Sequence, residues 1–63
     1  MVDEAWLLAK RAEIVSIEVC IQGMIATNKY RECIGDKPFY VEIDFQNKAA
    51  ELDNIYNEIM RER

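Results

Sequence analysis

The stretch that decides the fold runs from Ile14 to Arg31 and reads IVSIEVCIQGMIATNKYR. Apolar residues recur in it at steps of three and four, which is the spacing of one face of an α-helix. Together with one residue ahead of the stretch they form the row Leu7, Ile14, Ile17, Ile21 and Met24. The next two positions of this row are Asn28 and Arg31. A core-facing row that turns polar at one end marks either a helix that leaves its core or a site built on the helix.

The sequence predicts one long helix over residues 3–33, because no proline and a single glycine occur there. Asp3 suits the positive N-terminal end of the helix dipole. Gly35 then ends the helix, since glycine adopts the left-handed conformation most easily, and Pro38 prevents the helix from resuming. Residues 34–40 are therefore the predicted loop.

A second, shorter helix is predicted over residues 41–61. Its apolar residues recur at helical spacing, and Ile55 widens the row Val41, Phe45, Ala49, Leu52, Tyr56 and Ile59. A short strand through residues 39–43 is the alternative that β-branched and aromatic side chains leave open. We expect residues 1–63 to form one all-α domain, an antiparallel helical hairpin with a long first and a shorter second helix.

A second apolar row follows the other side of the first helix and contains Ala5, Leu8, Ala12, Val15, Val19, Gly23, Ala26 and Tyr30. A helix that is apolar on two sides must be covered on two sides, and the second helix covers one of them. A chain of 63 residues also buries too little surface to be comfortably stable alone. We therefore expect a homo-oligomeric helical bundle, with a partner of different sequence as the alternative.

Composition narrows the classes of function. The net charge is −4 and histidine is absent, while Cys20 and Cys33 lack the spacing of a metal site. We expect no enzyme, no cofactor and no metal, because no nucleophile has an adjacent base and no glycine-rich phosphate loop occurs. The net negative charge is unfavourable for binding to duplex nucleic acid, and no apolar run is long enough to span a membrane. We expect a cytoplasmic protein, since the acidic N-terminus does not resemble a signal peptide.

Against this acidic balance, cations and aromatic rings gather around the predicted turn. The candidate ligand-binding residues are Asn28, Lys29, Tyr30, Arg31, Lys37 and Tyr40. Arginine and lysine bind phosphate or carboxylate, asparagine hydrogen-bonds, and tyrosine stacks on a flat ligand. The alternative is structural: Lys29 and Arg31 are solvated cations at a helix C-terminus, Asn28 hydrogen-bonds locally, and the aromatic rings seal the hairpin.

The same segment resembles a family of short phage-encoded helical proteins. Their pattern reads Gly-Met-x-Ala-x-Asn-x-x-Arg, then a glycine, then Tyr-x-Glu-x-x-Phe. Here it corresponds to residues 23–31, GMIATNKYR, followed by Gly35, Tyr40, Glu42 and Phe45, about a third of the chain. The resemblance implies a phage origin, and hence the host cytoplasm. Small phage proteins of this size are often non-catalytic inhibitors of host defence.

Three hypotheses about function follow. The simplest is that the chain is a purely structural oligomerisation module, and the other two involve binding. In the first binding hypothesis, the protein sequesters a small anionic, nucleotide-derived signalling ligand. Arg31 pairs with the negative groups of the ligand, and Asn28 hydrogen-bonds to it. Tyr30 and Tyr40 cover the ligand, and Lys29 or Lys37 attracts it to the site. In the second binding hypothesis, the protein inhibits a basic host protein, which docks on the acidic residues of the second helix, Glu51, Asp53, Glu58 and Glu62.

Overall fold

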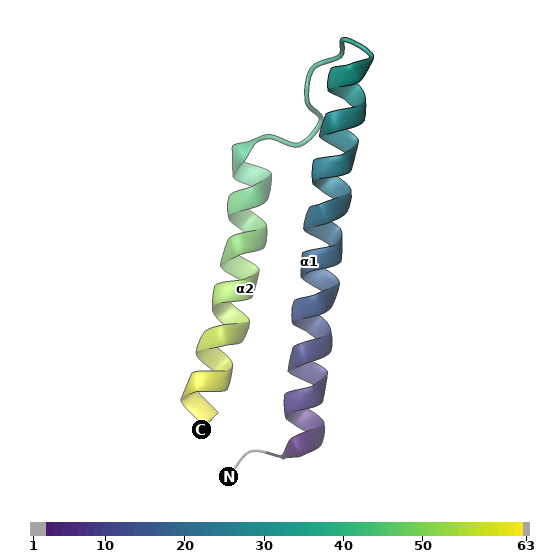
Figure 1. The fold of residues 1–63 in the computed structure, drawn as a ribbon. Coiled ribbons are helices and arrows are strands. Elements are labelled where there is room, and N and C mark those ends of the chain that lie inside the picture. Colours follow the sequence, from purple (N-terminus) through teal and green to yellow (C-terminus); the bar gives the residue numbers. More distant parts are fainter. Residues whose placement is uncertain (1–2, 63) are drawn as a thin grey trace.

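The computed structural model describes residues 3–62, which form two α-helices side by side in an antiparallel hairpin (Figure 1). Helix α1 spans Glu4–Cys33 and helix α2 spans Glu42–Glu62. The predicted all-α fold with a long first helix is confirmed. The alternative of a strand through residues 39–43 is wrong, because α2 begins inside that segment and no residue between 3 and 62 is in a strand.

The ends of α1 are fixed by local hydrogen bonds. At its start, the Asp3 carboxylate accepts a hydrogen bond of 3.3 Å from the backbone N–H of Ala5, as an N-cap residue does. At its end, Gly35 has φ +81° and its N–H donates to the Glu32 carbonyl at 3.1 Å. The next N–H, that of Asp36, donates to the carbonyl of Arg31 at 2.8 Å. These two bonds are a Schellman motif, so the predicted left-handed glycine stop is confirmed.

Helix α2 begins with its own carboxylate cap. Asp44 Oδ2 accepts a hydrogen bond of 2.9 Å from the backbone N–H of Val41, the residue that precedes the helix. This is the half of a capping box in which the third helical residue reaches back to the chain entering the helix. Glu42 adds a second negative charge to the first turn. The N-terminus of α2 thus already faces carboxylates of its own chain.

The row of α1 that faces α2 differs from the predicted row at one end. Its half-buried and buried members are Trp6, Lys10, Ile14, Ile17, Ile21, Met24, Asn28 and Arg31. Leu7, which was predicted to belong to it, is exposed. The row continues from Ile14 in two steps of four, to Lys10 and Trp6, and Leu7 lies one position further round the helix. The Lys10 ammonium lies 5.6 Å from the centroid of the Trp6 ring and pairs with Glu58 on α2.

The contact row of α2 is turned slightly from the predicted one. Its apolar members are Phe45, Leu52, Ile55 and Ile59, with Lys48 and the carboxylates Asp44 and Glu58 among the half-buried residues. The prediction that Val41, Ala49 and Tyr56 share this row is wrong, because all three are exposed. Ile55, expected only to widen the row, is the most buried residue of α2. Tyr56 and Ala49 are thereby left on the surface beside the helix contact.

The connection between the helices does not continue the hairpin outward. It folds back along the last turns of α1, so that α2 starts below the top of α1 (Figure 1). The end of α1 therefore faces loop backbone and not helix side chains. Among residues 3–62 only Met24 and Ile55 are buried, at 4% and 8% exposure, so the hydrophobic core is thin. Neither helix combines the length and the apolarity that crossing a bilayer requires.

Candidate binding site at the turn

The polar end of the α1 row meets the returning loop, and Asn28 makes the central contact. Its amide Nδ2 donates to the Tyr40 carbonyl at 2.8 Å, and its Oδ1 accepts from the Tyr40 N–H at 2.9 Å. Both hydrogen bonds are partly buried. An unpaired backbone N–H or C=O at such a place would be costly, and an amide side chain satisfies both with one residue. A polar residue, Asn28, therefore occupies this position of the row because the loop backbone, and not an apolar side chain, lies opposite it.

Arg31 makes the second contact to the loop, one turn further along the same row. Its Nε donates a hydrogen bond of 2.8 Å to the Lys37 carbonyl, and its guanidinium carbon lies 5.8 Å from the centroid of the Phe39 ring. Phe39 in turn packs edge-to-face on Tyr40, with ring centroids 4.9 Å apart. The guanidinium is held in place through Nε and the ring, and within the described chain its two terminal amino groups make no hydrogen bond or ion pair.

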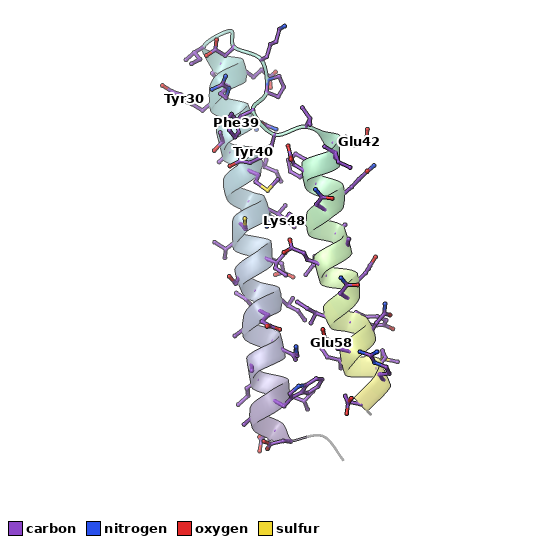
Figure 2. The ribbon with its side chains drawn as sticks, turned by 180° about the vertical axis from the view of Figure 1, so that it is seen from behind. Tyr30, Phe39, Tyr40, Glu42, Lys48 and Glu58 are labelled. Carbon is purple, nitrogen blue, oxygen red and sulfur yellow. The ribbon has the colours of Figure 1, made fainter. Side chains whose placement is uncertain are left out.

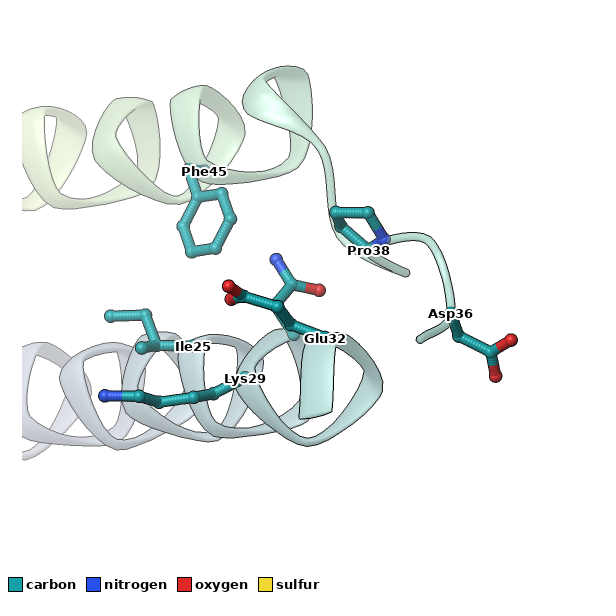
Figure 3. A pocket seen from close by; sticks show the side chains of 7 residues that line it. Ile25, Lys29, Glu32, Asp36, Pro38 and Phe45 are labelled. Atoms are coloured by element: carbon teal, nitrogen blue, oxygen red, sulfur yellow. The ribbon is translucent and has the colours of Figure 1, made fainter. Parts of the chain in front are cut away.

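A pocket of about 340 Å³ lies between the end of α1, the loop and the first turns of α2. Its lining residues are Ile25, Asn28, Lys29, Glu32, Asp36, Pro38 and Phe45. The Phe45 ring and the Ile25 side chain face each other across it, whereas the Asp36 carboxylate points away (Figure 3). The walls are thus mainly apolar, with one amide, one cation and the Glu32 carboxylate as the polar groups that remain.

The structure does not bring all six predicted site residues to this pocket. Asn28 and Lys29 line it, while Arg31 and Lys37 hold the adjacent loop. Tyr40 lines a different pocket of about 490 Å³ on the other flank of the helix contact, together with Cys20, Met24, Asp44, Asn47, Lys48 and Glu51. Tyr30 is 66% exposed and lies on the side of α1 away from α2 (Figure 2). Within one hairpin the two tyrosines therefore do not face the same space.

Two lysines in the body of the hairpin form ion pairs, whereas in the described part of the chain the three cations at the turn do not. Lys10 pairs with Glu58 and Glu13, and Lys48 pairs with Glu51 at 3.1 Å. The hydrogen bond to Glu58 raises the pKa of Lys10, and that to Glu51 raises the pKa of Lys48. By contrast, no ion pair within residues 3–62 involves the three cations Lys29, Arg31 and Lys37. These three cations thus lie near the carboxylates Glu32 and Asp36 without forming ion pairs with them.

Sequence reasoning did not identify Glu32, Pro38 or Phe45 as members of the pocket. Glu32 lies one helical turn after Asn28, so it could have been placed beside it from spacing alone. The positions of Pro38 and Phe45 depend on the loop folding back, which no local pattern indicates. Among residues 3–62 no group of three side chains of the kinds that bind metals is close enough to hold an ion.

Comparison with known proteins finds no matching family model, no similar curated protein and no similar solved structure. The resemblance to short phage proteins thus stays a prediction from the residues quoted for it.

Proposed function

We propose that the protein is a non-enzymatic binding protein that holds a small anionic, nucleotide-derived ligand at the turn end of the hairpin. The observation that carries the proposal is the cluster of Lys29, Arg31 and Lys37, which has no carboxylate partner although carboxylates pair with Lys10 and Lys48 elsewhere. Lys29 lines the pocket, while Arg31 and Lys37 belong to the adjacent loop contact. Cations without a carboxylate partner favour an anion, and Arg31 is fixed in one orientation before any ligand arrives.

The pocket suits the rest of a nucleotide better than it suits a simple anion. Its volume of about 340 Å³ is at the lower end of the usual range for small-molecule sites, which is about 300–1,000 Å³. The Phe45 ring and Pro38 offer flat apolar surface on which a base can pack. The Glu32 carboxylate accepts hydrogen bonds, as the amino group of a base requires, whereas it would repel a second phosphate.

In this proposal the side chains have separate roles. The terminal amino groups of Arg31 contact the phosphate, and Lys29 and Lys37 add positive charge from α1 and from the loop. Asn28 acts as a positioning residue, because its amide holds the loop through Tyr40. Binding without chemistry would withhold the ligand from other proteins, and the phage resemblance suggests a signal of host defence as that ligand.

The competing hypothesis, a basic host protein docked on α2, is weakened by how the acidic residues are used. Glu58 pairs with Lys10 and Glu51 pairs with Lys48, so two of the four carboxylates are already neutralised within the hairpin. Asp53 also lies on a different side of α2 from Glu62, because nine residues correspond to two and a half turns. The four residues therefore do not form one acidic face.

The proposal is tested by isothermal titration with linear and cyclic mono- and dinucleotides, and with inorganic phosphate as a further probe. We expect at least one nucleotide to bind and phosphate to bind more weakly. Lys37→Ala and Arg31→Ala should each weaken binding about tenfold or more, since a hydrogen bond to a charged group contributes about 1.5–3 kcal/mol. Lys37→Ala is the cleaner variant, because only its backbone carbonyl takes part in the loop contact.

Arg61→Ala is the matched control, since it removes a cation at the opposite end of the hairpin. It should leave the affinity unchanged, and circular dichroism should show that every variant keeps its helix content. Absence of binding to every nucleotide would contradict the proposal. An equal loss of affinity in Arg61→Ala would also do so, because the contact would then be unspecific attraction to positive charge.

A further inference from the structure

The side of α1 opposite α2 carries an apolar row that nothing in the hairpin covers. Leu8, Val15 and Val19 on this outer row are 60%, 50% and 65% exposed. With Ala12, Gly23 and Ala26 they repeat at steps of four and three residues, as the row that packs against α2 does. Regular spacing of this kind is what one helix needs to pack lengthwise against another. The outer row therefore has the form of a helix–helix contact whose second helix is missing.

The dimensions of the single hairpin indicate how much surface remains to be covered. Its radius of gyration is 15.2 Å, whereas a compact domain of this length has about 11 Å. Its accessible surface is 5179 Å², whereas a folded monomer of this mass exposes about 4200 Å². The difference is close to the roughly 800 Å² that each partner contributes to a standard interface.

The charges beside the outer row indicate the partner and its direction. One edge carries Glu4, Arg11 and Glu18 at seven-residue intervals. The other edge carries Ser16 and Thr27, and its charged residue Glu13 is already paired with Lys10. In the described chain none of the three charged residues forms an ion pair. In an antiparallel pair of identical helices, the charged edge of one helix lies beside the charged edge of the other. Residues of opposite charge then face each other. In a parallel pair the charged edge would meet the other edge, where Glu13 is already paired with Lys10.

We propose that two copies of this chain associate through the outer row of α1, with their α1 helices antiparallel. In the register that joins the largest side chains, Leu8 packs on Val19 of the partner subunit and Ala12 on Val15 of the partner subunit. Arg11 then lies beside Glu18 of the partner subunit, and the two-fold symmetry makes this pair twice. A shift by one heptad would place Glu18 against Glu18 of the partner subunit. The inference is independent of the ligand, because Arg31 and Lys37 lie outside the overlap.

Cysteine cross-linking tests the direction and the register. In a background in which the two exposed thiols are removed by Cys20→Ser and Cys33→Ser, Leu8→Cys and Val19→Cys chains are oxidised separately and as a mixture. The antiparallel pair predicts a disulfide between the two variants in the mixture only, because two Leu8 positions are about 16 Å apart along the axis. Disulfides within each separate variant would overturn the proposal and indicate a parallel pair.

A charge exchange tests the Arg11–Glu18 contact without a change in the apolar row. Sedimentation equilibrium should give a dimer for the native chain. Arg11→Glu alone should raise the dimer dissociation constant about tenfold or more, because carboxylates then face carboxylates, and addition of Glu18→Arg should restore it. Arg61→Glu is the control and should have no effect. A native chain that stays monomeric at high micromolar concentration, or a double variant that stays as weak as the single one, overturns the proposal.

Discussion

At the scale of single residues, the change from Met24 to Asn28 on the α1 row follows a change in what lies opposite. Met24 meets the side chains of α2, whereas Asn28 meets the backbone of the loop through hydrogen bonds of 2.8 and 2.9 Å. An apolar side chain at position 28 would leave the N–H and C=O of Tyr40 without these partners. The polar residue Asn28 on the row is thus a requirement of the hairpin itself.

Asn28→Ala is predicted to destabilise the hairpin by about 1–3 kcal/mol, because it removes both partners of the Tyr40 backbone from a partly buried place. Chemical denaturation measures the loss, and the Tyr40 amide should exchange its hydrogen much faster. Thr27→Ala, at the neighbouring exposed position, is the control and should stay within about 0.5 kcal/mol. Equal effects of the two substitutions would show that the Asn28 contacts to the loop are unimportant.

The two glycines are predicted to respond in opposite directions to alanine. Gly35 has φ +81°, so Gly35→Ala should cost about 1–2 kcal/mol through the left-handed backbone. Gly23 lies inside α1 with nothing within 4 Å of an added Cβ, so Gly23→Ala should stabilise the helix by about 0.5–1 kcal/mol. The melting temperatures of the two variants and of the native chain are compared by thermal unfolding at a protein concentration below that of self-association. A loss of stability in both would contradict this account of the C-terminal stop.

At the scale of elements, local signals were enough to predict the helices but not their rotation or the path of the loop. Gly35 acts over one turn, and the sequence predicts its role as the structure has it. Asp3 was predicted only to suit the helix dipole, and the structure shows that it is the N-cap residue. Tyr56 was placed in the contact and Ile55 beside it, because apolar character alone does not separate neighbouring positions on a helix. Lys10 was missed, since a lysine in a contact row is recognised only when its partner Glu58 is placed.

The contact between Lys10 and Glu58 predicts a pH dependence. The hydrogen bond between them lowers the pKa of Glu58 below its ordinary value of 4.5 and raises the pKa of Lys10 above 10.5. A carboxyl whose pKa is lower in the folded state stabilises that state above pH 4.5, and this contribution is lost as the pH falls through the lowered pKa. Lys10, whose pKa is higher in the folded state, stabilises that state below pH 10.5, and this stabilisation is lost as the pH rises through the raised pKa.

Glu58→Gln should therefore lower the melting temperature at pH 7 and have progressively less effect as the solution is made more acidic than pH 4.5. The reduction is expected to be small, because exposed ion pairs contribute little. Glu62→Gln, close by on the same helix, is the control and should show no such trend. An effect of Glu58→Gln that is the same at pH 7 and pH 3 would contradict the assignment of the pair.

At the scale of the whole molecule, a core with only two buried residues between positions 3 and 62 makes the hairpin sensitive to the truncation of a single side chain. Met24→Ala should cost about 2–5 kcal/mol, which is enough to unfold a chain of this size at room temperature. Met24→Leu keeps the volume and should cost less than about 1.5 kcal/mol. Circular dichroism with increasing urea distinguishes the two. Similar midpoints for both variants would mean that the helices are held mainly by contacts outside this core.

The connection through residues 34–41 has a further consequence for assembly. It keeps α2 beside α1 at an effective local concentration that, for short linkers, reaches the millimolar range. A second chain at cellular abundance does not match that concentration, so α2 occupies its side of α1 before any other molecule arrives. As the chain leaves the ribosome, α1 is complete first, and α2 covers one of its apolar sides as soon as it follows. The connection thus favours pairing of α1 with the α2 of the same chain over pairing with the α2 of another.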